Sequence, residues 1–174
     1  MRRLAACALL LAGCAAQPPP VEEKLKEPAP VVVPVAPRPP RQVISTTWSF
    51  DNRTDECLAV AASGRASLQV TVRRNAPIQL AVSLPRSLPP SKPAVIMRFS
   101  GPAGRWQINA RRMGSRQLTA VLGSDDTALS RVLVLLSGGV LEVGEQDQAI
   151  PSFGLAPSEA SGRLWFDCAR KSMT

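Results

Sequence analysis

Few side chains in this sequence could support catalysis. The chain contains no histidine, which excludes Ser-His-Asp and Cys-His catalysis and disfavours a transition-metal site. Ser91-Lys92 lies in a proline-rich turn without an S-x-x-K pattern, so no Ser/Lys dyad is expected. Asp125 and Asp126 are expected at a helix start, where carboxylates are favourable, rather than as metal ligands. No cofactor or metal is predicted.

One set of acidic residues could still support catalysis. Glycan-cleaving enzymes need only two carboxylic side chains, and Glu142, Glu145 and Asp147 are close in sequence. These residues surround an expected strand end and a turn, where acidic side chains are common because the turn is solvated. The structural interpretation is favoured, and a cell-wall glycan-active enzyme remains the alternative.

Arginine is the second chemically informative residue type. The region 42–174 holds 15 Lys and Arg against 10 Asp and Glu, a net charge near +5, and only two of these cations are lysines. The arginines expected around neighbouring hairpins are Arg73, Arg74, Arg105, Arg111, Arg112 and Arg116. A shared patch could bind phosphate-bearing headgroups through charge-assisted hydrogen bonds. The alternative, which the residues alone favour, is a basic face that keeps the sheet soluble and its edges unpaired.

The N-terminus has the features of an export signal. Arg2 and Arg3 precede the apolar run 4–11, which is too short for a permanent membrane span. The run closes on Leu-Ala-Gly followed by Cys14, and this ending resembles the lipobox of bacterial lipoproteins. The resemblance implies that residues 1–13 are removed and that Cys14 is acylated on its thiol and its new amine. The alternative is an ordinary signal peptide cut near Ala15 or Ala16.

The lipobox resemblance also implies a location. Two or three acyl chains anchor a protein stably where one does not. Ala15 follows the cysteine, and the aspartate that marks inner-membrane retention in such lipoproteins is missing. We therefore expect an outer-membrane lipoprotein that faces the periplasm, held by its lipid anchor, and no nucleic-acid partner.

Two cysteines remain once the leader and Cys14 are set aside. Cys57 and Cys168 lie near the two ends of the expected domain. In an oxidising compartment an even pair predicts a disulfide, and two buried free thiols are the alternative.

Residues 14–41 are expected to form a tether. Nine of the 24 residues from Gln17 to Pro40 are proline, a composition that excludes helix and sheet and favours polyproline II. Such a spacer could reach on the order of 80 Å. Proline-rich segments also serve as docking ligands, but in a lipoprotein the tether is the favoured interpretation.

Residues 42–174 are expected to form one β-rich domain. Apolar and polar residues alternate in a series of segments, which predicts antiparallel strands with one solvated face. The alternating segments are 68–73, 78–84, 95–99, 106–110 and 118–122, and further strands are expected at 46–50, 57–62, 140–143 and 149–153. A turn is expected at 74–77. The predicted class is mainly β, an antiparallel sandwich or open barrel with one or two short helices.

Two helices are expected late in the chain. Ser124-Asp125-Asp126 suits a helix N-cap, an apolar stripe follows to Ser137, and Gly138-Gly139 ends the helix. The segment after Pro157 is ambiguous, with a short helix preferred over a strand. The inward face of that helix is expected to carry Ala160, Leu164, Trp165 and Cys168. Trp48, Trp106 and Trp165 are expected to anchor the core rather than to stack on a ligand.

The order of these features resembles that of one family. Trp48, Cys57, a strand meander, a short acidic-capped helix and the segment 150–153 follow one another as in invasion-associated locus B proteins. The resemblance covers about 120 residues and contains no specific motif. It implies an exported, disulfide-bonded β-sandwich-like domain without an established catalytic site.

The sequence therefore favours a non-enzymatic function. We expect a tethered binding or assembly module for an envelope protein or an anionic glycolipid. The alternatives are the carboxylate-dependent glycan-active enzyme and a structural lipoprotein that crosslinks envelope layers.

Overall fold

The computed structural model describes residues 42–88, 94–144 and 150–173. Nine strands and two helices follow one another in these ranges. They are β1 (Val43–Asn52), β2 (Glu56–Ser63), β3 (Ala66–Arg73), β4 (Ile78–Ser83), β5 (Ala94–Gly101), β6 (Gly104–Arg112), β7 (Gln117–Gly123), α1 (Asp126–Leu136), β8 (Gly139–Val143), β9 (Ser152–Leu155) and α2 (Glu159–Met173). No helix within these ranges is long and apolar enough to cross a membrane.

The strands form one closed barrel. Their order is β1-β2-β3-β4-β7-β6-β5-β8-β9, and the parallel pair β1–β9 closes it. The other neighbouring strands are antiparallel. The predicted mainly β class with short helices is thus confirmed, and the parallel pair makes the barrel closed.

Alternation along the strands fills the interior. In β3, Leu68, Val70 and Val72 are fully buried, whereas Arg73 at the strand end is exposed. The predicted turn joins β3 to β4 and places Asn75 at a φ of 57°, a conformation that asparagine tolerates better than most residues. The inward-facing residues of the strands form one apolar core.

The helix α1 forms where the sequence predicts it. Its N-cap is Asp125, whose side chain accepts a hydrogen bond from the Ala128 backbone N–H at 2.8 Å. The helix ends at Leu136, and Gly138 follows with a φ of 88°. Ala128, Val132, Leu135 and Leu136 are buried, which shows that the predicted apolar stripe faces the core.

The C-terminal segment is a helix, but its buried face differs from the prediction. Gly162, Trp165 and Ala169 of α2 are buried, whereas Leu164 is 68% exposed. The expected face is therefore wrong at Ala160 and Leu164, which are exposed. Trp165 determines the orientation because this large ring packs beside Phe50 of β1, with the ring centroids 6.3 Å apart.

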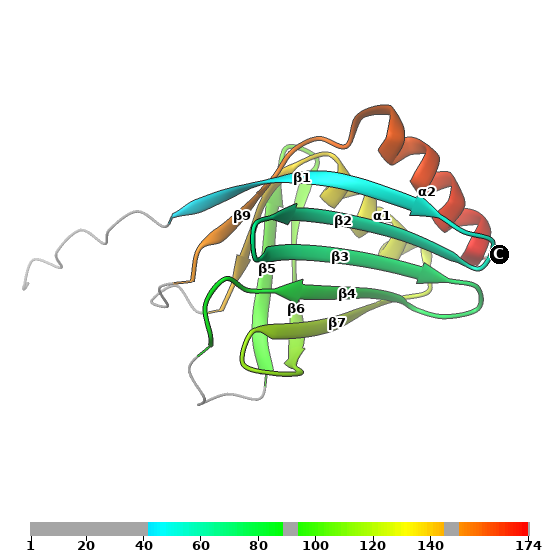
Figure 1. Ribbon diagram of the computed structural model, residues 1–174. Helices are drawn as coiled ribbons and strands as arrows, with labels where there is room; N and C mark the ends of the chain where they lie inside the picture. Colours follow the sequence, from blue (N-terminus) through cyan, green and yellow to red (C-terminus); the bar gives the residue numbers. More distant parts are fainter. Residues whose placement is uncertain (1–41, 89–93, 145–149, 174) are drawn as a thin grey trace, which may run out of the picture. The chain divides into compact units, whose positions relative to one another are not determined.

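The two ends of the barrel differ in what covers them (Figure 1). One end holds the β1–β2 turn, the β3–β4 turn and both ends of α1. We call it the helical end. The other end holds the start of β1, the β2–β3 turn and the β6–β7 turn. The two ends are distinguished below by their charges.

Candidate functional site

A disulfide joins Cys57 at the start of β2 to Cys168 of α2. The two Cα atoms are 6.1 Å apart and the residues are 111 positions apart in the sequence. Helix α2 contacts β1, β2 and β3, so the bond links this helix to the strands on which it packs. The predicted disulfide is confirmed.

The expected arginine patch is divided by the fold. Arg73 and Arg74 lie at the helical end, whereas Arg111, Arg112 and Arg116 surround the β6–β7 turn at the opposite end. Arg105 lies at the start of β6, about 20 Å along the strand from Arg111 at roughly 3.3 Å per residue. Successive turns of antiparallel strands alternate between the two ends of a barrel. For this reason, arginines close in sequence do not form one surface.

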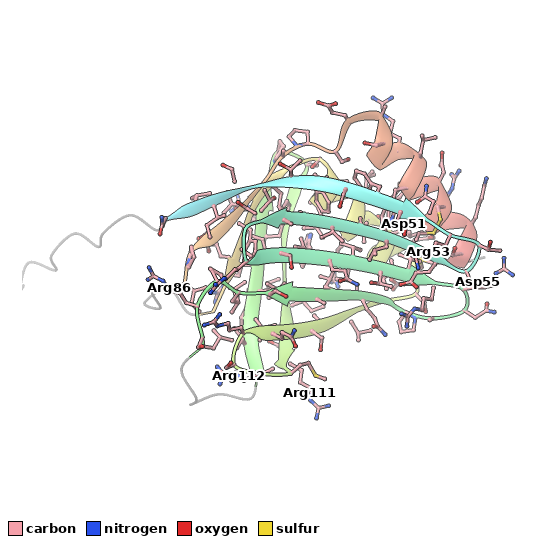
Figure 2. All side chains as sticks on the ribbon, viewed as in Figure 1. Asp51, Arg53, Asp55, Arg86, Arg111 and Arg112 are labelled. Carbon is pink, nitrogen blue, oxygen red and sulfur yellow. A yellow bond between two sulfur atoms is a disulfide. The ribbon has the colours of Figure 1, made fainter. Side chains whose placement is uncertain are left out.

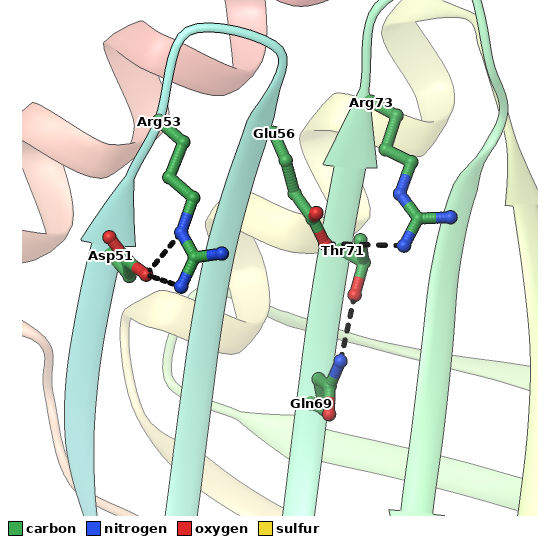
Figure 3. A network of polar contacts seen from close by, with 6 residues as sticks. All are labelled: Asp51, Arg53, Glu56, Gln69, Thr71 and Arg73. Atoms are coloured by element: carbon green, nitrogen blue, oxygen red, sulfur yellow. Dashed lines mark hydrogen bonds and ion pairs between the residues drawn. The ribbon is translucent and has the colours of Figure 1, made fainter.

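Three arginines in the turns of the helical end are paired with carboxylates, two of them in Figure 3. Arg53 contacts Asp51 at 2.7 Å, and Arg73 contacts Glu56 at 3.4 Å. Arg74 lies 3.9 Å from Asp55. These pairs neutralise much of the positive charge on this side of the molecule. They are solvent-exposed and contribute little to stability.

The opposite end carries arginines on adjacent turns. They are Arg65 in the β2–β3 turn, Arg86 in the segment after β4, and Arg111, Arg112 and Arg116 around the β6–β7 turn (Figure 2). We call this surface the basic end. Backbone hydrogen bonds from Leu84 N–H to Arg116 O and from Leu88 N–H to Ser115 O, both 2.8 Å, hold the segment after β4 against the β6–β7 turn. This contact brings Arg86 beside the turn that carries the other arginines.

Charge pairing distinguishes the basic end from the helical end. Arg65, Arg86 and Arg111 are exposed, and none of them forms an ion pair with a residue that the structure describes. Arg116 donates from Nε to Ser87 Oγ at 3.4 Å. Among the described residues, the turns of this end carry no carboxylate. Glu145 and Asp147 belong to the segment between β8 and β9, which lies outside the described ranges.

The N-terminal side of the chain enters the barrel at the basic end. Val43 begins β1 beside Ser152 of β9, and the Ser152 N–H donates to Gln42 O at 2.9 Å. Guanidinium groups bind phosphate and carboxylate in bidentate geometry. The basic end can therefore bind a polyanionic surface, with the preceding segment attached on the same side. Sequence reasoning missed Arg65 and Arg86 because nothing in the alternation pattern shows which turns share an end.

The carboxylates proposed for glycan chemistry are only partly described. Glu142 lies opposite Arg98 in the β5–β8 register. It lines a surface hollow of about 340 Å³, in which no other carboxylate lines the part that the structure describes. Glu145 and Asp147 lie outside the described residues, as do Cys14 and residues 14–41. The carboxylate pair that the enzyme hypothesis needs therefore remains a prediction.

The three tryptophan side chains of the domain contribute to packing. Trp165 is fully buried, and Trp48 and Trp106 are partly buried against the core. Trp48 stacks on Phe50, and Trp106 stacks on Phe99, each with ring centroids 5.8 Å apart. Within the described ranges, no cluster of acidic or cysteine side chains is suited to hold a metal ion.

No protein-family model matches this chain, and no curated protein or solved structure shows significant similarity to it.

Proposed function

We propose that this protein is an outer-membrane lipoprotein whose barrel is a non-enzymatic binding module for an anionic glycolipid surface. Cys14 would carry the acyl chains, residues 14–41 would form the tether, and the barrel would face the periplasm. The ligand chemistry is that of phosphate-bearing headgroups. Neither a cofactor nor catalysis is part of this proposal.

One observation carries the proposal. Arg65, Arg86 and Arg111, which form no ion pair with a described residue, lie at the end of the barrel where β1 begins. The segment that would form the tether is attached at this same end, so the basic end is able to face the membrane that holds the anchor. Cations at that end attract anionic headgroups, at about 1 kcal/mol for each arginine near the surface.

Vesicle binding tests the proposal. The full chain would carry Cys14→Ser, so that acylation contributes nothing to binding. In this background, Arg65, Arg86 and Arg111 are replaced by Gln. Losing three such contacts corresponds to about 3 kcal/mol, or about a 100-fold weaker partition onto vesicles containing lipid A or phosphatidylglycerol.

A matched control has the same change of net charge at other positions. Arg53, Arg74 and Arg170 are exposed and pair with carboxylates, so their replacement by Gln should change the partition less than threefold. Binding of the parent chain should fall steeply with added salt and be absent on phosphatidylcholine vesicles. Equal losses in the two triple variants, or equal binding to neutral vesicles, would refute the proposal.

A further inference from the structure

Strands β6 and β7 are paired over only a short part of their length. Their register contains Arg111↔Thr119 and Arg112↔Leu118 and no pair closer to the start of β6. Figure 1 shows β7 leaving β6 after the hairpin and running beside β4. On its other side β6 is paired with β5 along its whole length, from Gly104 to Arg111. The edge of β6 that faces β7 therefore has no strand partner from Arg105 to Asn109.

The backbone groups on this open edge can be identified from the hydrogen-bond alternation. Met113 N–H donates to Gln117 O at 2.9 Å, so Met113 is directed toward β7. Along a strand, alternate residues direct both N–H and C=O to the same side. Arg105, Gln107 and Asn109 therefore direct their backbone groups away from β5. We call these three residues the open edge.

The side chains beside the open edge are basic and polar on the outside. Arg105, Gln107, Asn109 and Arg111 are all exposed. Trp106 and Ile108 point to the opposite face and are partly buried against the core. Across the gap, Val121 of β7 is 57% exposed. A strand laid on this edge would meet positive charge outside and apolar surface inside.

We propose that the open edge binds an extended acidic peptide segment of a partner protein as an added β-strand. An unpaired strand edge is a template for such pairing, in which main-chain hydrogen bonds give affinity and alternate side chains give specificity. Acidic residues of the segment opposite Arg105 and Asn109 would lie beside Arg105 and diagonally from Arg111. β-branched residues would cover Trp106 and Ile108. This site goes beyond the proposed binding of headgroups. It lies along β6 and shares only Arg111 with the basic end.

Charge decides against a second copy of this chain as the occupant. Antiparallel pairing of the open edge with its own copy, centred on Gln107, would place Arg105 of one molecule diagonally beside Arg111 of the other. Diagonal neighbours in a strand pair are within reach of long side chains, and like charges there repel each other. An acidic strand in the same register is attracted to these arginines instead.

The test uses the full chain with Cys14→Ser and a short synthetic peptide in which Glu and Val alternate. Binding is measured by fluorescence anisotropy, and amide protection by hydrogen exchange followed by NMR. We expect the amides of Arg105, Gln107 and Asn109 to become protected when the peptide binds. Protection elsewhere, with these amides unchanged, would overturn the proposal.

Two variants distinguish main-chain hydrogen bonding from electrostatic attraction of the peptide to the basic surface. Gln107→Pro removes one N–H from the open edge and leaves the β5 ladder intact, so it should weaken binding about tenfold. Gln107→Ala keeps the N–H and should bind within threefold of the parent. Equal affinity of the proline and alanine variants would contradict strand addition.

A peptide control does not depend on folding of the proline variant. Methylation of alternate peptide nitrogens, on the edge that would face β6, should abolish binding, whereas methylation of the other set should not. Equal binding of the two methylated peptides would also refute strand addition.

Charge reversal distinguishes this site from the basic end. Arg105→Glu should weaken the Glu-Val peptide and strengthen a matched Lys-Val peptide, while leaving vesicle partition unchanged. Replacing Arg65 and Arg86 should instead weaken vesicle partition and leave the binding of both peptides unchanged. If Arg105→Glu affects neither peptide, the open edge is not the binding site, whatever the vesicle result.

Discussion

Loss of the Cys57–Cys168 bond should strongly destabilise the barrel. The bond closes a loop of 111 residues, and in the chain-entropy model such a cross-link stabilises the folded state by about 4–5 kcal/mol by restricting the unfolded chain. For a domain of this size, that free energy corresponds to a melting temperature lower by about 15 °C. Helix α2 should remain docked, because Trp165 and Ala169 are fully buried against the barrel and neither takes part in the bond.

Two perturbations isolate the contribution of the cross-link. Cys57→Ala with Cys168→Ala removes the sulfur atoms, whereas reduction of the parent chain retains both side chains in a core where Cys57 is fully buried. Urea unfolding at equilibrium should give similar losses in both cases. The urea dependence should also become steeper, because the unfolded chain without a cross-link exposes more surface.

The reasoning has clear refuting outcomes. A loss below about 1 kcal/mol in both experiments would show that the bond restricts the unfolded chain far less than the entropy model requires. Alkylation of both Cys57 and Cys168 in the folded, unreduced protein would show that the bond is not formed. If the double variant loses much stability but the reduced parent chain does not, the loss comes from packing at Cys57 rather than from the cross-link.

Three further predictions concern the helices and are measured by the same urea assay. Asp125→Ala should cost about 1 kcal/mol because it removes the hydrogen bond to the Ala128 N–H, whereas Asp126→Ala should cost less because Asp126 only adds charge in the first turn. Trp165→Ala should cost about 3–5 kcal/mol, but Trp165→Phe much less, since Trp165 Nε1 has no hydrogen-bond partner among the described residues. Gly162→Ala should destabilise α2, although alanine normally favours a helix, because the new Cβ would collide with Ser158 Oγ; adding Ser158→Gly should recover the loss, and no recovery would contradict this explanation.

The strands and the first helix could be predicted because their patterns are local. Period-two alternation identifies the inward residues of β3 and β4, such as Leu68 and Leu80, which are buried as expected. The acidic start and glycine end of α1 are equally local signals. Each of these features depends on residues within one element.

The neighbours of each strand could not be predicted in this way. Alternation at Val82 shows which face is buried, but it does not show that β4 pairs with β7 rather than with β5. The parallel pairing of Val43 with Ser152 also has no local signal. The arginine surface depends on this pairing order, which explains why Arg73 and Arg111 are at opposite ends and why Arg65 and Arg86 were missed.

Helix α2 shows a related limit. Leu164 and Trp165 are adjacent apolar residues, and either could face the core on pattern alone. The disulfide at Cys168 and the contact between Trp165 and Phe50 select the second orientation. Both constraints come from strands more than a hundred residues earlier in the chain.

The parallel β1–β9 pair has a consequence for biogenesis. A chain that emerges N-terminus first, from a ribosome or a translocation pore, presents β1 long before its second neighbour exists. The barrel cannot close until Ser152–Leu155 has emerged, and Cys57 cannot reach its partner until Cys168 has followed. Contacts so distant in sequence slow folding and expose strand edges to wrong partners. The chain therefore stays in an unfolded form that can pass through a translocation pore until nearly all of it has emerged. A chaperone that protects it during that interval would act on the unpaired side of β1.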